Sequence, residues 1–187
     1  MVDDTALFEV LSFIQARGHI GQPLADAVAH ADRYVALIPP GCRSVVDLGS
    51  GGGLPALVIA VRRPDLHVTM VERRGARADV LLKACRTLGI DQRTVVIADD
   101  VRRLADTDRR FDVVTARSFA APAITLRWAK ALVVAGGLVL VSDPPGNSEA
   151  ISARWGQALT QVPGMVDGGA QDGVHLFHVE QSAPSAG

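Results

Sequence analysis

The stretch VVDLGSGGGLPALVIA, from Val45 to Ala60, determines which fold this sequence predicts. An apolar run ends in an acid, four glycines fall within five positions, and a second apolar run follows a proline. This order is typical of a buried strand joined to a helix by a tight loop. Glycine allows a sharp turn and a close approach of the backbone to a ligand, and the helix start offers free N–H groups. The stretch therefore predicts a ligand site at the carboxyl end of a strand.

The rest of the chain predicts a Rossmann-like α/β fold. Short apolar runs alternate with helical patterns, which favours a mainly parallel central sheet with helices on both faces, preceded by two N-terminal helices. Ligands on such sheets bind beyond the carboxyl ends of the strands. The expected strands are 44–48, 66–72, 94–98, 111–116, 137–142 and 174–180, and the expected helices are 5–17, 23–38, 54–63, 76–88, 122–134 and 147–159.

Length and composition favour a single domain. The 187 residues are 48% apolar, enough for one sizeable core. We expect one domain over 1–180, made of an N-terminal helical cap (1–40) and a Rossmann-like core (44–180), and a disordered tail over 181–187.

The same totals restrict the classes of partner. The net charge of −1 gives no overall basic signature for nucleic acid. The sequence shows no apolar run long enough for a membrane span and no basic signal peptide at its acidic start. Cys42 and Cys85 lie far apart and are expected to be reduced thiols. We expect a cytoplasmic protein without a metal site.

Two acids at predicted strand ends help to identify the ligand. Asp47, directly before the glycines, would repel a pyrophosphate but suits the ammonium group of a methionine, directly or through water. Glu72 ends the second strand, 19 residues after Gly53, where a carboxylate accepts hydrogen bonds from ribose hydroxyls. Three alternatives stay open. The glycines serve only as a turn, residues 51–56 bind a dinucleotide through a G-x-G-x-x-A pattern, or Glu72 is a surface acid beside Arg73 and Arg74.

Further candidates follow the third and fourth strands. Asp99 or Asp100 is placed to face an adenine amino group, and the alternative is a solvated helix cap. Arg117 would emerge over the cleft, where a guanidinium contacts a cofactor carboxylate or a phosphate, or stacks on a base. A purely structural arginine is the alternative there.

The motifs DLGSGGGLP (47–55), RPD (63–65) and DVVTARSFA (112–120) resemble the RsmG (GidB) methyltransferases. Those enzymes use S-adenosylmethionine to methylate N7 of a guanine in small-subunit ribosomal RNA. The resemblance runs from about Leu24 to Ser142, and it implies a Rossmann-like class I methyltransferase fold, with residues 1–180 as a single methyltransferase domain. It implies that His30 matches a histidine of the family's N-terminal helix. It also implies cofactor contacts at Gly49, Leu54, Val101, Arg102 and Arg117.

The sequence departs from the family pattern at three places. Val101-Arg102 stands where an Ala–Glu or Val–Glu pair is common. Ser142-Asp143-Pro144-Pro145, interpreted as a rigid turn, replaces a Lys-Gly end of strand five. The last residues lack the basic tail of many members. These differences remove cationic groups that an RNA substrate would attract.

The resulting hypothesis is S-adenosylmethionine-dependent methyl transfer to a guanine N7 of 16S rRNA, free or in the 30S subunit, by a monomer. N7 has a lone pair and no proton, so the reaction needs alignment and charge stabilisation rather than a general base. Arg117 is the candidate catalytic residue. The candidate cofactor-binding residues are Asp47, Gly49, Ser50, Gly51, Gly53, Leu54, Glu72, Arg73, Asp100, Val101, Arg102 and Arg117.

Two other functions stay open. One is methylation of a small molecule in a pocket shaped by the N-terminal helices and residues 142–145. The other is a non-catalytic module of the same fold that binds RNA or protein. A basic face formed by five arginines would favour RNA, whereas pairing with Asp65, Glu72 and Asp79 would favour a small molecule. The arginines are Arg62, Arg63, Arg73, Arg74 and Arg77.

Overall fold

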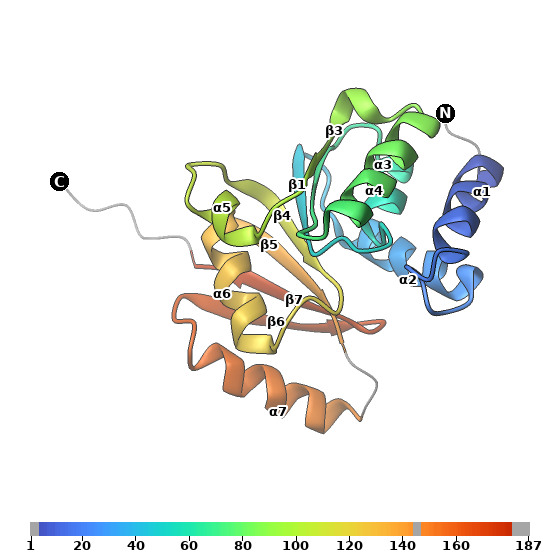
Figure 1. Ribbon diagram of the computed structural model, residues 1–187. Coiled ribbons are helices and arrows are strands. Elements are labelled where there is room, and N and C mark those ends of the chain that lie inside the picture. Colours follow the sequence, from blue (N-terminus) through green and yellow to red (C-terminus); the bar gives the residue numbers. More distant parts are fainter. Residues whose placement is uncertain (1–3, 144–146, 181–187) are drawn as a thin grey trace.

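A computed structural model describes residues 4–143 and 147–180 of the chain. One seven-stranded sheet has the order β3-β2-β1-β4-β5-β7-β6 (Figure 1). The first five strands of that order are parallel, and β7 is antiparallel to both β5 and β6. The strands are β1 (Ser44–Leu48), β2 (His67–Val71), β3 (Thr94–Ile97), β4 (Phe111–Ala116), β5 (Val133–Ser142), β6 (Met165–Gln171) and β7 (Val174–Val179).

Helices cover both faces of the sheet, and each face has its own apolar core (Figure 1). The first four helices pack on one face of the sheet and the last three on the other. Successive strand residues point to opposite faces, so neighbouring residues of one strand enter different cores. Val45 lies in the first core, whereas Val46 and Leu48 lie in the second. The helices are α1 (Asp4–Gln15), α2 (Leu24–Leu37), α3 (Ala56–Arg62), α4 (Gly75–Thr87), α5 (Val101–Ala105), α6 (Pro122–Leu132) and α7 (Ser148–Leu159), with a 3-10 turn η1 (Asp91–Arg93).

The N-terminal helices share their core with the sheet. Leu7 and Ile14 of α1 and Tyr34 of α2 are fully buried in the same apolar cluster as α3 and α4. This shared core supports our proposal that residues 1–180 form one domain. The tail predicted to be disordered (181–187) and most of the predicted turn (144–146) lie outside the described residues.

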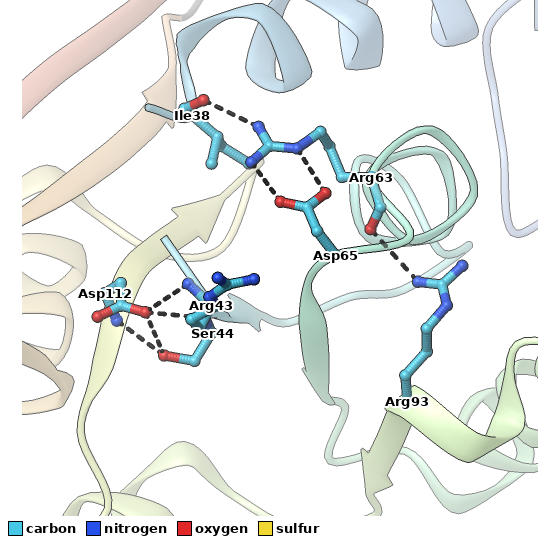
Figure 2. Close-up of polar contacts among 7 residues, drawn as sticks. All are labelled: Ile38, Arg43, Ser44, Arg63, Asp65, Arg93 and Asp112. Atoms are coloured by element: carbon cyan, nitrogen blue, oxygen red, sulfur yellow. Dashed lines mark hydrogen bonds and ion pairs between the residues drawn. The ribbon is translucent and has the colours of Figure 1, made fainter. Parts of the chain in front are cut away.

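Polar contacts at the amino ends of the strands set the register of the sheet (Figure 2). Asp112 Oδ2 accepts hydrogen bonds from the backbone N–H groups of Arg43 and Ser44 and from the Ser44 hydroxyl, at 2.8–2.9 Å. Burial opposes ionisation of Asp112, but these bonds outweigh it and lower the pKa of the carboxyl. Arg63 makes two 2.9 Å contacts to Asp65 and donates to the Ile38 carbonyl. Because β1 and β4 are parallel and their amino ends are linked here, their carboxyl ends lie side by side at the opposite edge of the sheet.

The predicted fold class is confirmed, with local corrections. The helix expected over 122–134 ends at Leu132, and β5 begins at Val133, earlier than the expected Gly137. Helix α1 runs from Asp4 to Gln15, whereas 5–17 was expected. The sequence did not predict α5, which has only five residues, or β6. Strand β6 carries two glycines, a register shift and mostly exposed side chains, so it has no apolar alternation to recognise.

The described residues contain neither a membrane-spanning helix nor a metal-binding cluster. None of the helices there has the length and apolar character to cross a membrane. Nor do these residues contain a cluster of three or more His, Cys, Asp or Glu side chains arranged to hold a metal ion.

Candidate functional site

Three adjoining cavities lie at the carboxyl edge of the sheet. The β2–β3 cavity, about 500 Å³, lies beyond the ends of β2, β3 and β4. The loop cavity, about 220 Å³, lies between the glycine loop and the segment that joins α1 to α2. The α2–β5 cavity, about 520 Å³, lies between α2, the end of β5 and α7. Ser118 lines all three, so the cavities meet at the end of β4.

The glycines of the loop serve the fold as well as the site. Gly49, Gly51 and Gly53 have φ values of +68°, +53° and +86°, a region that other residues rarely adopt. A Cβ at Gly52 would lie 2.6 Å from the His19 carbonyl oxygen, and one at Gly53 would lie 2.4 Å from Leu57 Cδ1. Close approach to a ligand was the expected reason for these glycines. Gly52 and Gly53 are instead required by packing inside the protein.

Asp47 lies beneath this loop and is 1% exposed. Its Oδ1 accepts a 2.7 Å hydrogen bond from the Thr115 hydroxyl, while Oδ2 is buried and has no hydrogen-bond partner among the described residues. Burial raises the pKa of Asp47 from 3.8 to about 6. An unpaired buried carboxylate oxygen is costly, and a cationic ligand or a bound water would satisfy it.

His19 provides a second unpaired atom at the same place. This residue lines the loop cavity, and its Nδ1 is buried without a hydrogen-bond partner in the described part of the chain. An acceptor beneath the loop and a ring nitrogen at its side fit a small polar ligand such as an amino acid group. Sequence reasoning gave His19 no role, because its contact with the loop arises only from the packing of the α1–α2 segment on Gly52.

Glu72 holds the glycine loop to the end of β2. Its Oε2 accepts from the Gly51 N–H at 2.9 Å and its Oε1 from the Arg74 N–H at 2.8 Å. The residue is 5% exposed and lines the β2–β3 cavity, so it is not the solvated surface acid of the alternative interpretation. Each oxygen retains a lone pair for a ligand hydroxyl.

Asp100, which follows β3, caps the start of α5 in this structure. It accepts a hydrogen bond from the Arg102 N–H at 3.0 Å and pairs with the Arg102 side chain at 3.0 Å. This pairing lowers the pKa of Asp100. Asp99, Asp100, Val101 and Arg102 also line the β2–β3 cavity.

Arg117 lies at the boundary between two cavities. It lines both the loop cavity and the α2–β5 cavity, and its guanidinium donates to the side-chain oxygen of Gln22. Ser118 adopts a left-handed conformation with φ +52°, which turns the chain sharply after β4. Gln22 and Ser118 were not predicted. Ser118 follows Arg117 directly within the 112–120 motif, and that position was the available signal.

The α2–β5 cavity contains His30, which the family resemblance indicated. His30 Nε2 lies 2.9 Å from the Ser142 hydroxyl, and its ring meets that of Tyr34 edge to face. Burial, followed by the charges of Arg117 and Arg33, lowers the pKa of His30, so the ring is neutral at pH 7.

Most of the predicted site residues come together at this edge. Asp47 and Gly53 lie under the loop and line none of the three cavities. Of the others, Gly49, Glu72, Arg73, Asp100, Val101 and Arg102 line the β2–β3 cavity, and Gly49, Ser50, Gly51, Leu54 and Arg117 line the loop cavity.

The five arginines divide into two groups. Arg62 pairs with Asp4 and Asp32, and Arg63 pairs with Asp65. Arg73, Arg74 and Arg77 line the β2–β3 cavity and form no ion pair within residues 4–143 and 147–180. A basic rim therefore remains beside the cavities, although it is smaller than five arginines would make it.

Comparisons with known proteins identify the family that this chain matches. A family model described as "GidB: rRNA small subunit methyltransferase G" matches residues 25–160. A ribosomal RNA small subunit methyltransferase G from Nocardioides sp. is 39% identical over 125 residues, 64% of this chain and 49% of that protein. The protein of the same name from Acidiphilium cryptum is 31% identical over 137 residues, 72% of this chain and 61% of its own length. The chain thus spans about half the length of the curated relatives it matches.

A solved structure shows the same fold. The crystal structure of cofactor-bound Rv0187 from MTB superimposes with a TM-score of 0.71 and covers 96% of this chain and 92% of its own. The two sequences are 20% identical, so this likeness concerns the fold alone.

Proposed function

The chain belongs to the rRNA small subunit methyltransferase G (GidB) family, and we propose that it transfers a methyl group from S-adenosylmethionine to N7 of a guanine in 16S rRNA. One observation carries the cofactor part of the proposal. His19, whose Nδ1 is buried and unpaired, lines the loop cavity, and Asp47, whose Oδ2 is buried and unpaired, lies beneath the same glycine loop. The loop cavity adjoins the β2–β3 cavity, where the buried Glu72 lies. Asp47 and the glycine loop suit the methionine part of this cofactor, and the neighbouring Glu72 suits its ribose.

The described residues divide the task of binding. Asp47 and the loop residues Gly49, Ser50, Gly51 and Leu54 would hold the methionine part. Glu72 would accept from the ribose, and Asp100 and Val101 would border the adenine. When bound, this cofactor supplies a methyl group on a positively charged sulfur, which is already activated for transfer.

The chain's own part in the reaction is alignment. Arg117 and Ser118 lie where the loop and α2–β5 cavities meet, so a base held in the α2–β5 cavity faces the cofactor across them. Guanine N7 carries no proton, so no side chain has to remove one. Rate comes from holding the nucleophile in line and from stabilising the positive charge that moves to the base.

The RNA substrate is supported by the unpaired arginines. Arg73, Arg74 and Arg77 border the β2–β3 cavity, where they would meet phosphates of an RNA whose target base enters the adjoining cavity. The 30S subunit is the form of 16S rRNA that we propose as the partner, with the cytoplasm as the location. We propose a monomer, because a single chain supplies all the residues named here.

The test is direct detection of the product. The protein is incubated with S-adenosylmethionine and 30S subunits from a strain whose 16S rRNA lacks 7-methylguanosine, and the digested rRNA is analysed by mass spectrometry. One new 7-methylguanosine per 16S rRNA is expected. Absence of this nucleoside, with the cofactor bound in the same preparation, would contradict the rRNA substrate.

A small-molecule acceptor is a second candidate, favoured by the α2–β5 cavity. Its volume of about 520 Å³ lies in the usual range for small ligands, and α2 and the end of β5 both line it, as that hypothesis expected. This candidate gains if the cofactor binds and 30S subunits and free 16S rRNA stay unmethylated.

A further inference from the structure

The α2–β5 cavity is lined by a buried acid that the function proposed above does not use. Asp143 directly follows β5, lines this cavity, and has a side chain only 5% exposed. Trp155 donates its indole N–H to Asp143 Oδ1 at 2.7 Å. The His175 ring packs against the same oxygen, with Nδ1 3.4 Å away and without a hydrogen bond among the described residues. Within residues 4–143 and 147–180, no hydrogen bond reaches Oδ2.

Three elements fix the position of this carboxylate. His175 belongs to β7 and pairs in register with Val141 of β5. Its ring stacks on Phe177 at 4.8 Å, and its Nε2 lies 2.8 Å from Asp167 of β6. Trp155 of α7 is 3% exposed. A carboxylate held in this way needs little rearrangement to accept a hydrogen bond from a ligand.

The place of Asp143 within the cavity determines which edge of a bound base it meets. Arg117 and Ser118 line both this cavity and the loop cavity, whereas Asp143 and Trp155 line this cavity and not the loop cavity. A guanine that turns N7 toward the shared boundary therefore presents its opposite edge to Asp143. That edge carries N1–H and the 2-amino group, which are both donors, and a carboxylate is solely an acceptor.

We propose that Asp143, positioned by Trp155 and His175, selects guanine by accepting hydrogen bonds from its N1–H and 2-amino edge. This inference rests on the proposed function. Adenine has an acceptor at N1 and would place its lone pair against the carboxylate, which is unfavourable.

The same contact strengthens during the reaction. As N7 uses its lone pair to bond the methyl group, the base becomes positively charged and its N1–H becomes a stronger donor. Asp143 takes no part in proton transfer, and it acts by binding the charged base better than the neutral one. Asp143 is thus both a specificity determinant and a source of transition-state stabilisation.

The experiment compares guanine with hypoxanthine at the methylated position. 30S subunits are rebuilt from 16S rRNA in which the target guanosine alone is replaced by inosine, which keeps N7 and N1–H but lacks the 2-amino group. We expect the wild-type protein to prefer guanosine in kcat/KM by roughly tenfold or more, the range for one hydrogen bond to a charged group. Asp143→Asn, which keeps an oxygen for Trp155, should reduce this preference to roughly threefold or less.

Asp108→Asn is the matched control. Asp108 is exposed and lines none of the three cavities. This variant removes the same charge as Asp143→Asn and should keep the wild-type preference for guanosine. Binding of S-adenosylhomocysteine, measured by calorimetry, should be unchanged in both variants and shows that they are folded.

Each failure has a distinct signature. Equal methylation of guanosine and inosine by the wild-type protein, or an unchanged preference in Asp143→Asn, overturns the role of Asp143 and leaves the proposed function standing. If the wild-type protein forms no 7-methylguanosine on any RNA, the proposed function fails and this inference fails with it.

Discussion

At the scale of single residues, two acids at strand ends perform different tasks. Glu72 satisfies two backbone N–H groups and thereby shapes the glycine loop before any ligand arrives. Asp47 has one oxygen bonded to Thr115 and the other unpaired. The sequence indicated both acids from their positions, but only the structure separates the acid that builds the site from the acid that awaits a partner.

The raised pKa of Asp47 has consequences for stability. Burial raises this pKa from 3.8 to about 6, so the folded protein binds the proton more tightly than the unfolded chain. The ligand-free protein therefore loses stability as the pH rises through this window, and the loss is complete above it. This pKa shift corresponds to a loss on the order of 3 kcal/mol in the free energy of unfolding when Asp47 is ionised. An ammonium partner would offset part of that loss.

We predict that the affinity for S-adenosylmethionine depends on pH through Asp47. The ionised carboxylate binds an ammonium group, so the Kd should be constant near pH 7 and should rise below about pH 6, by up to about tenfold per pH unit. Calorimetry between pH 5 and pH 7.5 measures this dependence. Asp47→Asn should bind more weakly and lose most of the slope, whereas an equal slope in both proteins would assign the effect to another group.

At the scale of elements, the glycine loop joins the N-terminal helices to the sheet. Gly52 is where the α1–α2 segment rests on the loop, through His19 and Ile20. Any shift there moves His19 at the loop cavity and Gln22, which holds Arg117.

We predict that Gly52→Ala destabilises the fold and weakens cofactor binding. The added Cβ would lie within 2.7 Å of the His19 carbonyl oxygen and of Ile20 Cγ1, so the segment has to move. Overpacking of this kind costs about 1–3 kcal/mol, or roughly 2–12 °C in Tm for a chain of this size. Differential scanning calorimetry gives the change in Tm.

Gly156→Ala provides the control for that substitution. Gly156 lies inside α7 with no atom within 4 Å of a new Cβ, so alanine should raise the stability of the helix by up to about 1 kcal/mol. A Gly52→Ala variant as stable as wild type would show that the α1–α2 segment is not packed on the loop.

The elements also show how far sequence reasoning reaches. Apolar periodicity and the glycine loop predicted the parallel strands and their helices, because buried strands and amphipathic helices carry their own pattern. Sequence reasoning missed β6, because its exposed side chains and glycines have no such pattern. It also missed His19, Gln22 and Ser118, because their roles arise from contacts between elements distant in the sequence.

At the scale of the whole molecule, a net charge of −1 conceals a local asymmetry. Arg62 and Arg63 are paired with acids at a distance from the cavities, while Arg73, Arg74 and Arg77 border the β2–β3 cavity. Composition alone could not distinguish paired from unpaired arginines, since pairing depends on Asp4, Asp32 and Asp65 in the folded chain.

We predict that Arg74→Ala weakens binding to 30S subunits and reduces its dependence on salt. Loss of one phosphate contact should lower the slope of log K against log salt by about one. Filter binding over a series of KCl concentrations measures this slope. Arg62→Ala removes an equal charge from a residue already paired with Asp4 and Asp32, and should leave the slope unchanged. Equal effects of the two substitutions would argue against a localised RNA face.

The cofactor site around Asp47 is the central claim, and calorimetry tests it most directly. S-adenosylmethionine, S-adenosylhomocysteine and NADH are titrated separately into the wild-type protein and into Asp47→Ala at pH 7.5. We expect the wild-type protein to bind both methionine compounds with micromolar Kd and not to bind NADH. The affinity of Asp47→Ala for the methionine compounds should be lower by at least about tenfold. Binding of NADH alone, or equal binding of S-adenosylmethionine by both proteins, would contradict this claim.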